Sequence, residues 1–282
     1  MMRRVIIGVA LLSLAAAALA THPPRFRRWS VYLPRAGGFV DPSSGGLAWW
    51  LPMNTTNAVD PVLPDASVFG RDGIIHQATA NEPTRIPAGD LTNTVYDFKG
   101  VDDYIEATNS ATYLNGVTSL SASVWINPDI FGSNDGLIGS HNAGNTTGFG
   151  LLEGGGAAPA NENIGFFVFG SGGVGSFQSS GNELVSNQWQ LVVGTWRGSD
   201  GQMMAYHDGS NVISQASSSA TGTLLQDTRI TIGSEGAVAI GSRMFDGQMY
   251  SPKIYSNLVL TSAEVASLFT NTHPVTGTEV LP

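Results

Sequence analysis

Short apolar runs separated by turn residues fill most of the chain from Leu47 to Tyr255. Between Leu120 and Asn127 every second residue is aliphatic, and the residues between them are polar apart from Trp125. This period of two is typical of a strand with one face in a core. Many of the other runs are rich in β-branched and aromatic residues. The sequence therefore predicts an all-β protein, with strands at Leu47–Met53, Tyr96–Phe98, Tyr104–Ala107, Leu120–Asn127, Leu137–Ser140, Gly148–Leu152, Ile164–Phe169, Gln188–Trp196, Met203–His207, Arg229–Gly233 and Gly247–Tyr255.

Turn residues and a single helix signal complete this picture. The chain contains 35 glycines, and glycine favours tight turns because it adopts positive φ angles without strain. Asp–Gly pairs at 200–201 and 208–209 predict a hairpin at each end of one strand. Thr261 and Glu264 form a capping-box pattern, followed by apolar residues at helical spacing. We therefore predict one short helix at the C-terminal end of a β-sandwich.

The first twenty residues have the layout of a secretory signal peptide. Two arginines precede an apolar run from Val5 to Ala20 that ends in small residues. The 16 residues of that run would extend only about 24 Å as a helix, whereas a hydrocarbon core is about 30 Å thick. We expect export with cleavage after Ala20 and a secreted or surface-associated protein. A retained hydrophobic segment, which would give membrane contact, is the alternative.

Residues 21–45 contain prolines, glycines, arginines and isolated aromatics without sustained periodicity, which is typical of a linker or an ordered arm. Arg25, Arg27, Arg28 and Trp29 form a basic and aromatic cluster. This cluster could dock on an acidic partner surface, including the folded part of another copy. A solvated tether is the simpler interpretation. The folded domain is expected over residues 46–282.

Charge and cysteine content exclude several classes of function. The net charge of the chain is −9, but residues from Gly46 onward include seven basic and 21 acidic residues, a net charge of −14. Such a domain repels phosphate backbones, so we expect no nucleic-acid partner. The chain has no cysteine. Disulfides, thiolate metal sites and cysteine nucleophiles are therefore excluded.

Four segments, in the same order along the chain, resemble the laminin-G-like jelly rolls of the concanavalin A-like lectin/glucanase superfamily. Tyr96–Ile105 (YDFKGVDDYI) is similar to the "FDGxDDYV" segment of that family. The resemblance implies a two-sheet antiparallel jelly roll in which glycan or protein binding is common and calcium is frequent. The other matching segments are Leu120–Ile126, then Asn187–Trp196 with Tyr206–Gly209, then Met244–Tyr250 with Ile254–Tyr255 and Leu260–Val265.

Catalytic patterns are not found in the sequence. Glycoside hydrolysis needs two carboxylates about 5 to 9.5 Å apart, and the E-x-D-x-x-E strand of the superfamily's laminarinase-type members does not occur here. Neither a G-x-S-x-G elbow nor a zinc-type histidine spacing occurs. Gly170–Gly175 matches a dinucleotide-type glycine pattern, but no helical period follows it, which favours a hairpin loop. No catalytic residue is predicted.

Two kinds of candidate site residue remain. Trp125 and Trp196 are candidate platforms for a sugar ring, because a pyranose stacks on an exposed aromatic face; packing inside the sandwich is the alternative. Asp102, Asp103 and Asp246 are candidate calcium ligands in turn segments that match the family pattern, and Asp65 is a weaker one. These aspartates could instead cap backbone amides.

We therefore expect a non-catalytic, exported or surface binding module that recognises a glycan or an extracellular protein. The alternative is a structural subunit of an extracellular assembly or virion that self-associates through its arm. Glycoside hydrolase activity would require a catalytic site that no known sequence pattern reveals.

Overall fold

The computed structural model describes residues 46–51, 62–67, 70–76, 83–86, 95–142, 146–154, 162–179, 182–215, 218–226, 229–236 and 243–275. The predicted signal segment 1–20 and the predicted arm, with Arg25, Arg27, Arg28 and Trp29, lie outside these residues. Within the described residues, no helix has both the length and the apolar character needed to cross a membrane.

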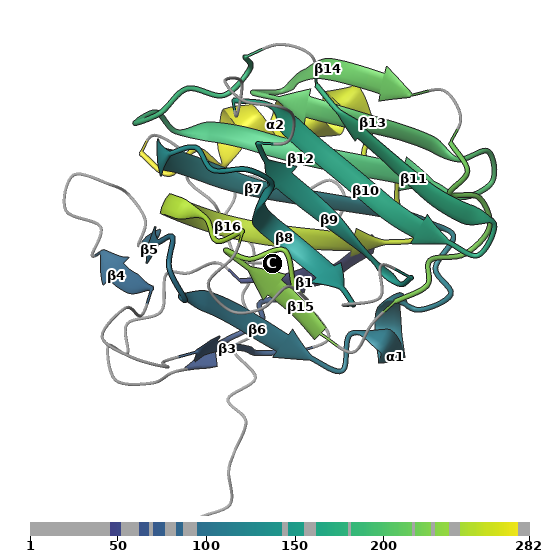
Figure 1. Cartoon of the computed structure of the whole chain (residues 1–282), viewed down its shortest axis with the longest axis horizontal. Coiled ribbons are helices and arrows are strands. Elements are labelled where there is room, and N and C mark those ends of the chain that lie inside the picture. The colour runs from purple at the N-terminus through teal and green to yellow at the C-terminus, as the bar shows by residue number, and fades with distance from the viewer. Residues whose placement is uncertain are drawn as a thin grey trace, which may run out of the picture. The chain divides into compact units, whose positions relative to one another are not determined.

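Two antiparallel sheets of eight strands each form the fold and lie face to face (Figure 1). The first sheet has the order β14-β13-β12-β7-β16-β5-β4, with β1 also paired to β16. Its strands are β1 Leu47–Trp50, β4 Thr84–Ile86, β5 Val95–Lys99, β7 Ser119–Ile130, β12 Gln190–Arg197, β13 Gln202–His207, β14 Ser210–Gln215 and β16 Asp246–Ser256.

The second sheet has the order β11-β10-β9-β8-β15-β6-β3-β2. Neighbours in this order that are far apart in sequence, such as β8 and β15, give the crossovers expected of a jelly roll. Its strands are β2 Val62–Leu63, β3 Gly73–His76, β6 Tyr104–Thr108, β8 Asp135–His141, β9 Gly148–Glu153, β10 Ile164–Gly170, β11 Gly173–Gln178 and β15 Arg229–Ile232.

The predicted all-β jelly roll is confirmed, and each predicted strand overlaps an observed one. The helices are α1 (Ala111–Leu114), which was not predicted, and α2 (Ser262–Asn271), which was. Strands β2, β3 and β4 were missed, and they have two to four residues each, too few for a period of two to show. Strands β11 and β14, of six residues each, were also missed. The glycine-rich segment does form a hairpin, but its second strand starts at Gly173, immediately after the turn.

The core lies between the two sheets. The alternating aliphatic residues of β7, such as Val124 and Ile126, are fully buried, as are Phe166 and Val168 of β10 in the other sheet. Burial of such side chains contributes about 1.5–3 kcal/mol each. Gly194 of β12 makes this packing possible, because a Cβ atom there would lie 2.6 Å from the ring of Phe166. The two sheets therefore meet closely at β10 and β12.

Helix α2 covers part of the outer face of the first sheet. Its N-terminus has the predicted capping box, with Thr261 accepting from the Glu264 amide and Glu264 accepting from the Thr261 amide. Phe269 stacks on Trp125 with ring centroids 5.6 Å apart, and the Trp125 Nε1 donates to Thr272 Oγ1 at 2.8 Å. Trp125, a candidate exposed platform, is therefore buried beneath this helix.

Asp65 fixes the loop between β2 and β3 to strand β1. Its Oδ1 accepts from the amides of Trp50 at 3.0 Å and Ser67 at 2.8 Å. Its Oδ2 accepts from the Ser67 hydroxyl at 2.6 Å and the Arg71 amide at 2.7 Å. The predicted alternative for this residue, capping of backbone amides, is therefore what the structure has.

Replacement Asp65→Ala should lower the free energy of unfolding by roughly 1.5–3 kcal/mol, because three amides and a hydroxyl lose a charged acceptor. Denaturant unfolding followed by tryptophan fluorescence measures this. Asp200→Ala is the control, since Asp200 accepts bonds from Arg197 and Gln202 on an exposed turn. Equal losses for the two variants would contradict the anchoring role of Asp65.

Candidate ligand-binding face

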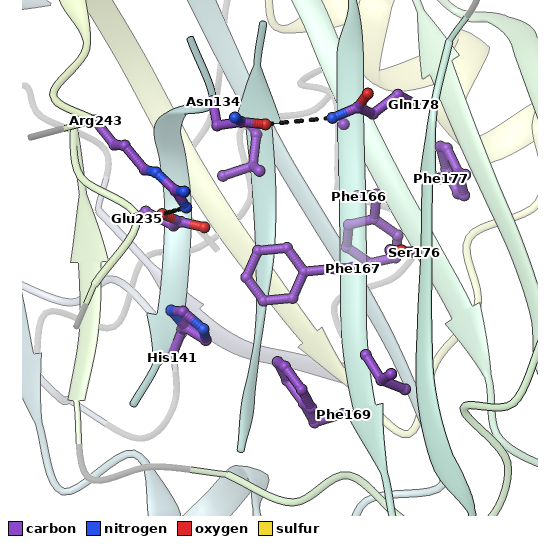
Figure 2. A pocket seen from close by; sticks show the side chains of 13 residues that line it. Asn134, His141, Phe166, Phe167, Phe169, Ser176, Phe177, Gln178, Glu235 and Arg243 are labelled. Carbon is purple, nitrogen blue, oxygen red and sulfur yellow. Dashed lines mark hydrogen bonds and ion pairs between the residues drawn. The ribbon is translucent and has the colours of Figure 1, made fainter. Parts of the chain in front are cut away.

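A pocket of about 640 Å³ lies on the outer face of the second sheet, over strands β8 to β11 (Figure 2). The alternation of β10 produces it. Phe166 and Val168 point into the core, so Phe167 and Phe169 point outward and line the pocket. A volume of this size lies within the range of about 300–1,000 Å³ that is typical of ligand sites.

Three rings form an aromatic cluster in this pocket. His141 stacks on Phe169 with ring centroids 5.8 Å apart and meets Phe167 edge to face at 5.3 Å. Phe167 and Phe169 are also arranged edge to face, at 5.8 Å. The two phenylalanines are half-buried, and His141 is buried. Because the three rings hold one another, they give the pocket a defined apolar floor.

A glycine on the neighbouring strand makes room for this cluster. Gly150 of β9 is paired with Phe167 across the ladder, and a Cβ atom at position 150 would lie 2.3 Å from Cε1 of the Phe167 ring. The ring therefore lies flat over the glycine backbone. Any larger residue at position 150 would displace it.

Polar groups surround the rings. Gln178 donates from Nε2 to Oδ1 of Asn134 at 3.3 Å, and Nη1 of Arg243 donates to Oε2 of Glu235. In Figure 2 the two pairs lie at one end of the pocket, and His141 and Phe169 lie toward the other end. Among the described residues, Nδ1 of His141 is buried and makes no hydrogen bond. The pocket therefore combines an apolar floor with donors and acceptors at its edge.

Two buried carboxylates lie at the end of the sandwich next to this pocket. Asp135 begins β8 and Glu153 ends β9, and the two are paired across the ladder. Neither oxygen of Glu153 accepts a hydrogen bond from the described residues. Loss of solvation raises the pKa of Glu153 well above its usual value, and the neighbouring Asp135 and Asp246 raise it further. Glu153 therefore keeps its proton to a higher pH than an exposed glutamate does.

Burial also raises the pKa of Asp135, to about 6. The Gly132 amide and Arg243 lower this pKa, while Asp246 and Glu235 raise it. Glu153 is fully buried and Asp135 nearly so, and neither lines the pocket. The two carboxylates are neighbours across the ladder, but neither can reach a polysaccharide in the pocket. They are therefore not placed to act on it as acid and base.

A family model described as the concanavalin A-like lectin/glucanases superfamily matches residues 99–266. The chain belongs to this superfamily. The resemblance found in the sequence is thereby confirmed. No curated protein matches the chain in sequence.

Solved structures of similar fold include binding domains of toxins. The ligand binding domain of botulinum neurotoxin serotype D, in complex with N-acetylneuraminic acid, is 16% identical with a TM-score of 0.57, and the alignment covers 80% of this chain and 51% of that one. The binding domain of Paraclostridial Mosquitocidal Protein 1 is 14% identical with a TM-score of 0.60, covering 80% and 52%. The chain thus spans about half the length of either toxin domain.

Domain 4 of AbnA, an extracellular GH43 arabinanase from Geobacillus stearothermophilus, was solved in complex with arabinotriose. It is 13% identical to this chain with a TM-score of 0.57, and the alignment covers 79% of this chain and 97% of that domain. At this level of identity the likeness establishes the fold that the superfamily members share.

Trp125 and Trp196 do not form the exposed platforms that the sequence predicted. Their side chains are 1% and 0% exposed. Trp125 lies beneath α2, and Trp196 belongs to the core and donates from Nε1 to the carbonyl of Ala220 at 2.6 Å. For Trp125 the prediction was wrong because alternation identifies the face of a strand, but not what covers that face. Trp196 is paired with Leu120 on the core face, so packing inside the sandwich, the alternative, is what the structure has. The rings that do reach a pocket are those of β10 and His141.

The four aspartates predicted as calcium ligands do not form one site. Asp65 is fully used by its loop, as described above. Asp103 is buried and accepts from the Lys99 amide, and Asp246 lies opposite Lys99 in the strand register. No group of three histidine, cysteine, aspartate or glutamate side chains in the described part of the chain is arranged to hold a metal ion. Calcium binding by Asp102, Asp103, Asp246 or Asp65 stays a prediction.

The raised pKa of Asp135 predicts a pH-dependent stability. Between pH 4 and 6 the folded state binds more protons at this group than the unfolded state does, so stability should fall as pH rises through this interval. The interval from 3.8 to about 6 corresponds to a contribution on the order of 3 kcal/mol. The Asp135→Asn and Glu153→Gln variants should show a weaker decline than the wild type in denaturant unfolding at each pH.

Asp200→Asn is the matched control for charge, because Asp200 lies on an exposed turn and its pKa is lowered by Arg197. It should keep the wild-type decline. A decline of the same size in Asp135→Asn would show that the buried pair does not produce it.

Proposed function

We propose that this chain is a non-catalytic binding module that recognises a glycan on the outer face of the second sheet. The observation that carries the proposal is the cluster of His141, Phe167 and Phe169 in a pocket edged by polar side chains. Sugars have apolar ring faces and a rim of hydroxyl groups, so they bind where aromatic rings lie beside hydrogen-bonding groups.

Each part of the pocket has a role in this proposal. Phe167 and Phe169 stack with the faces of sugar rings. Asn134 and Gln178 offer amide donors and acceptors to hydroxyl groups. Because the rings are packed against one another and over Gly150, little ordering is needed on binding.

The neighbouring structures support a glycan as the ligand class. The arabinanase domain, of which the alignment covers 97%, was solved with arabinotriose, and the neurotoxin domain with N-acetylneuraminic acid. A protein ligand would use the same face, and the experiment below distinguishes the two.

We propose further that the module is exported and works outside the cell or at its surface. The signal-like segment 1–20 and the extracellular origin of the arabinanase support this. The missing glucanase motif and the burial of Glu153 and Asp135 support a non-catalytic role. Self-association through residues 21–45 stays a prediction, tested by the solution mass of the protein with and without that segment.

The variants Phe167→Ala and Phe169→Ala should each weaken glycan binding at least about tenfold, equal to roughly 1.4 kcal/mol, because each removes a stacking face. A panel of immobilised polysaccharides first identifies a ligand for the wild-type protein, and isothermal titration calorimetry with its oligosaccharides then measures affinity. Phe269→Ala is the matched control, since this half-buried ring stacks on Trp125 on the other sheet.

Phe269→Ala should lower stability and leave glycan affinity unchanged. If the wild-type protein bound no polysaccharide but retained a protein ligand through Phe167, the glycan assignment would be wrong. If Phe269→Ala weakened glycan binding as much as Phe167→Ala, the assignment of the site to the second sheet would be wrong.

A further inference from the structure

Arg243 is the only lysine or arginine among the described residues that line the pocket. Its side chain is 41% exposed, and its guanidinium donates to Glu235, whose side chain is only 5% exposed. The charge of Arg243 is therefore offset by a carboxylate that is itself withdrawn from water. A pocket built to bind an anion would instead leave its guanidinium free for a bidentate contact.

Both members of this pair are fixed by strand β8. The Gly136 amide donates to the carbonyl of Arg243 at 3.0 Å. On the other side, a Cβ atom at Gly136 would lie 2.0 Å from the backbone nitrogen of Glu235, so the two segments are in direct contact. If Arg243 moved away to bind a ligand, Glu235 would be left as a buried carboxylate without its ion partner, which is costly in free energy.

The surroundings add further negative charge. Asp135 is close enough to Arg243 and Glu235 for each to affect its ionisation, and Asp246 acts on it as well. Beyond the site, the chain from Gly46 onward has a net charge of −14. An anionic ligand would therefore meet an unfavourable field on approach, and an arginine whose charge is already paired with a carboxylate.

We propose that this pocket binds uncharged oligosaccharides and excludes those that carry carboxylate or sulfate groups. This inference rests on the proposed function, since it names the ligand class of the same site. It separates two possibilities that the neighbouring structures leave open, a neutral sugar such as arabinotriose and an acidic sugar such as N-acetylneuraminic acid.

The test compares the affinity of the full chain for neutral polysaccharides with its affinity for acidic ones. The probes are arabinan, galactan and dextran, with polygalacturonate and its carboxyl-reduced form as a pair that differs only at C6, where a carboxylate becomes a neutral hydroxymethyl group. Affinity electrophoresis and calorimetry at low salt should show binding to neutral probes. The carboxyl-reduced polymer should bind at least tenfold more tightly than polygalacturonate, or should bind where polygalacturonate does not bind at all.

The Glu235→Gln variant tests the stated cause. It removes the negative charge that offsets Arg243 while keeping the side-chain size, so the ratio of acidic to neutral affinity should rise at least tenfold. Asp200→Asn is the matched control, because it removes the charge that offsets Arg197 in the same way on a turn that does not line the pocket. Its ratio should stay at the wild-type value. The wild-type comparison needs no variant and decides the matter if Glu235→Gln does not fold.

The outcomes separate the two proposals. Equal or tighter binding of acidic probes by the wild-type protein overturns the exclusion and leaves glycan binding intact. An unchanged ratio in a folded Glu235→Gln variant overturns the role of the ion pair. Failure to bind any polysaccharide overturns the proposed function, and the inference that rests on it falls with it.

Discussion

Phe166 and Val168 are held in the core between the two sheets, and this determines which side chains of strand β10 reach the surface. Because side chains alternate along a strand, burial of these two residues places Phe167 and Phe169 on the outer face. A shift of one residue would exchange the two sets, so the same contacts that stabilise the sandwich also fix the pocket. Gly194 and Gly150 allow this arrangement from either side, since the first admits Phe166 into the core and the second admits Phe167 over the outer face.

The fold could be predicted well from the sequence because its determinants are local. The alternating aliphatic residues of β7, the capping box at Thr261 and the ordered family segments each act over a few residues, and each is seen in the structure. The very short strands β2 to β4 carry too few residues for such a pattern. β2 pairs with β3, β3 with β6 and β4 with β5, and no local signal reveals these pairings.

The candidate site was harder to predict because it depends on which faces are covered. Trp125 was correctly assigned away from the core face of β7, but α2 covers it, while the outer face of β10 stays open. The pocket also unites His141, Phe167 and Arg243 from separate strands and loops, with nothing in their spacing to connect them.

The pairing of the buried carboxylates could not be predicted from the sequence either. Asp135 and Glu153 are isolated in sequence and become neighbours only through the pairing of β8 with β9, whereas the conspicuous Asp102 and Asp103 lie in a turn without a third ligand group.

The central claim is that ligands bind on the outer face of the second sheet, against the rings of β10. Nuclear magnetic resonance of isotope-labelled protein tests this most directly, because it reports on every aromatic side chain at once during titration with a bound oligosaccharide. The chemical-shift changes should be largest for His141, Phe167 and Phe169. They should be small for Trp125, which lies beneath α2, and for Phe269, which belongs to α2. Shifts centred on Trp125 and Phe269, with the β10 rings unaffected, would contradict the claim.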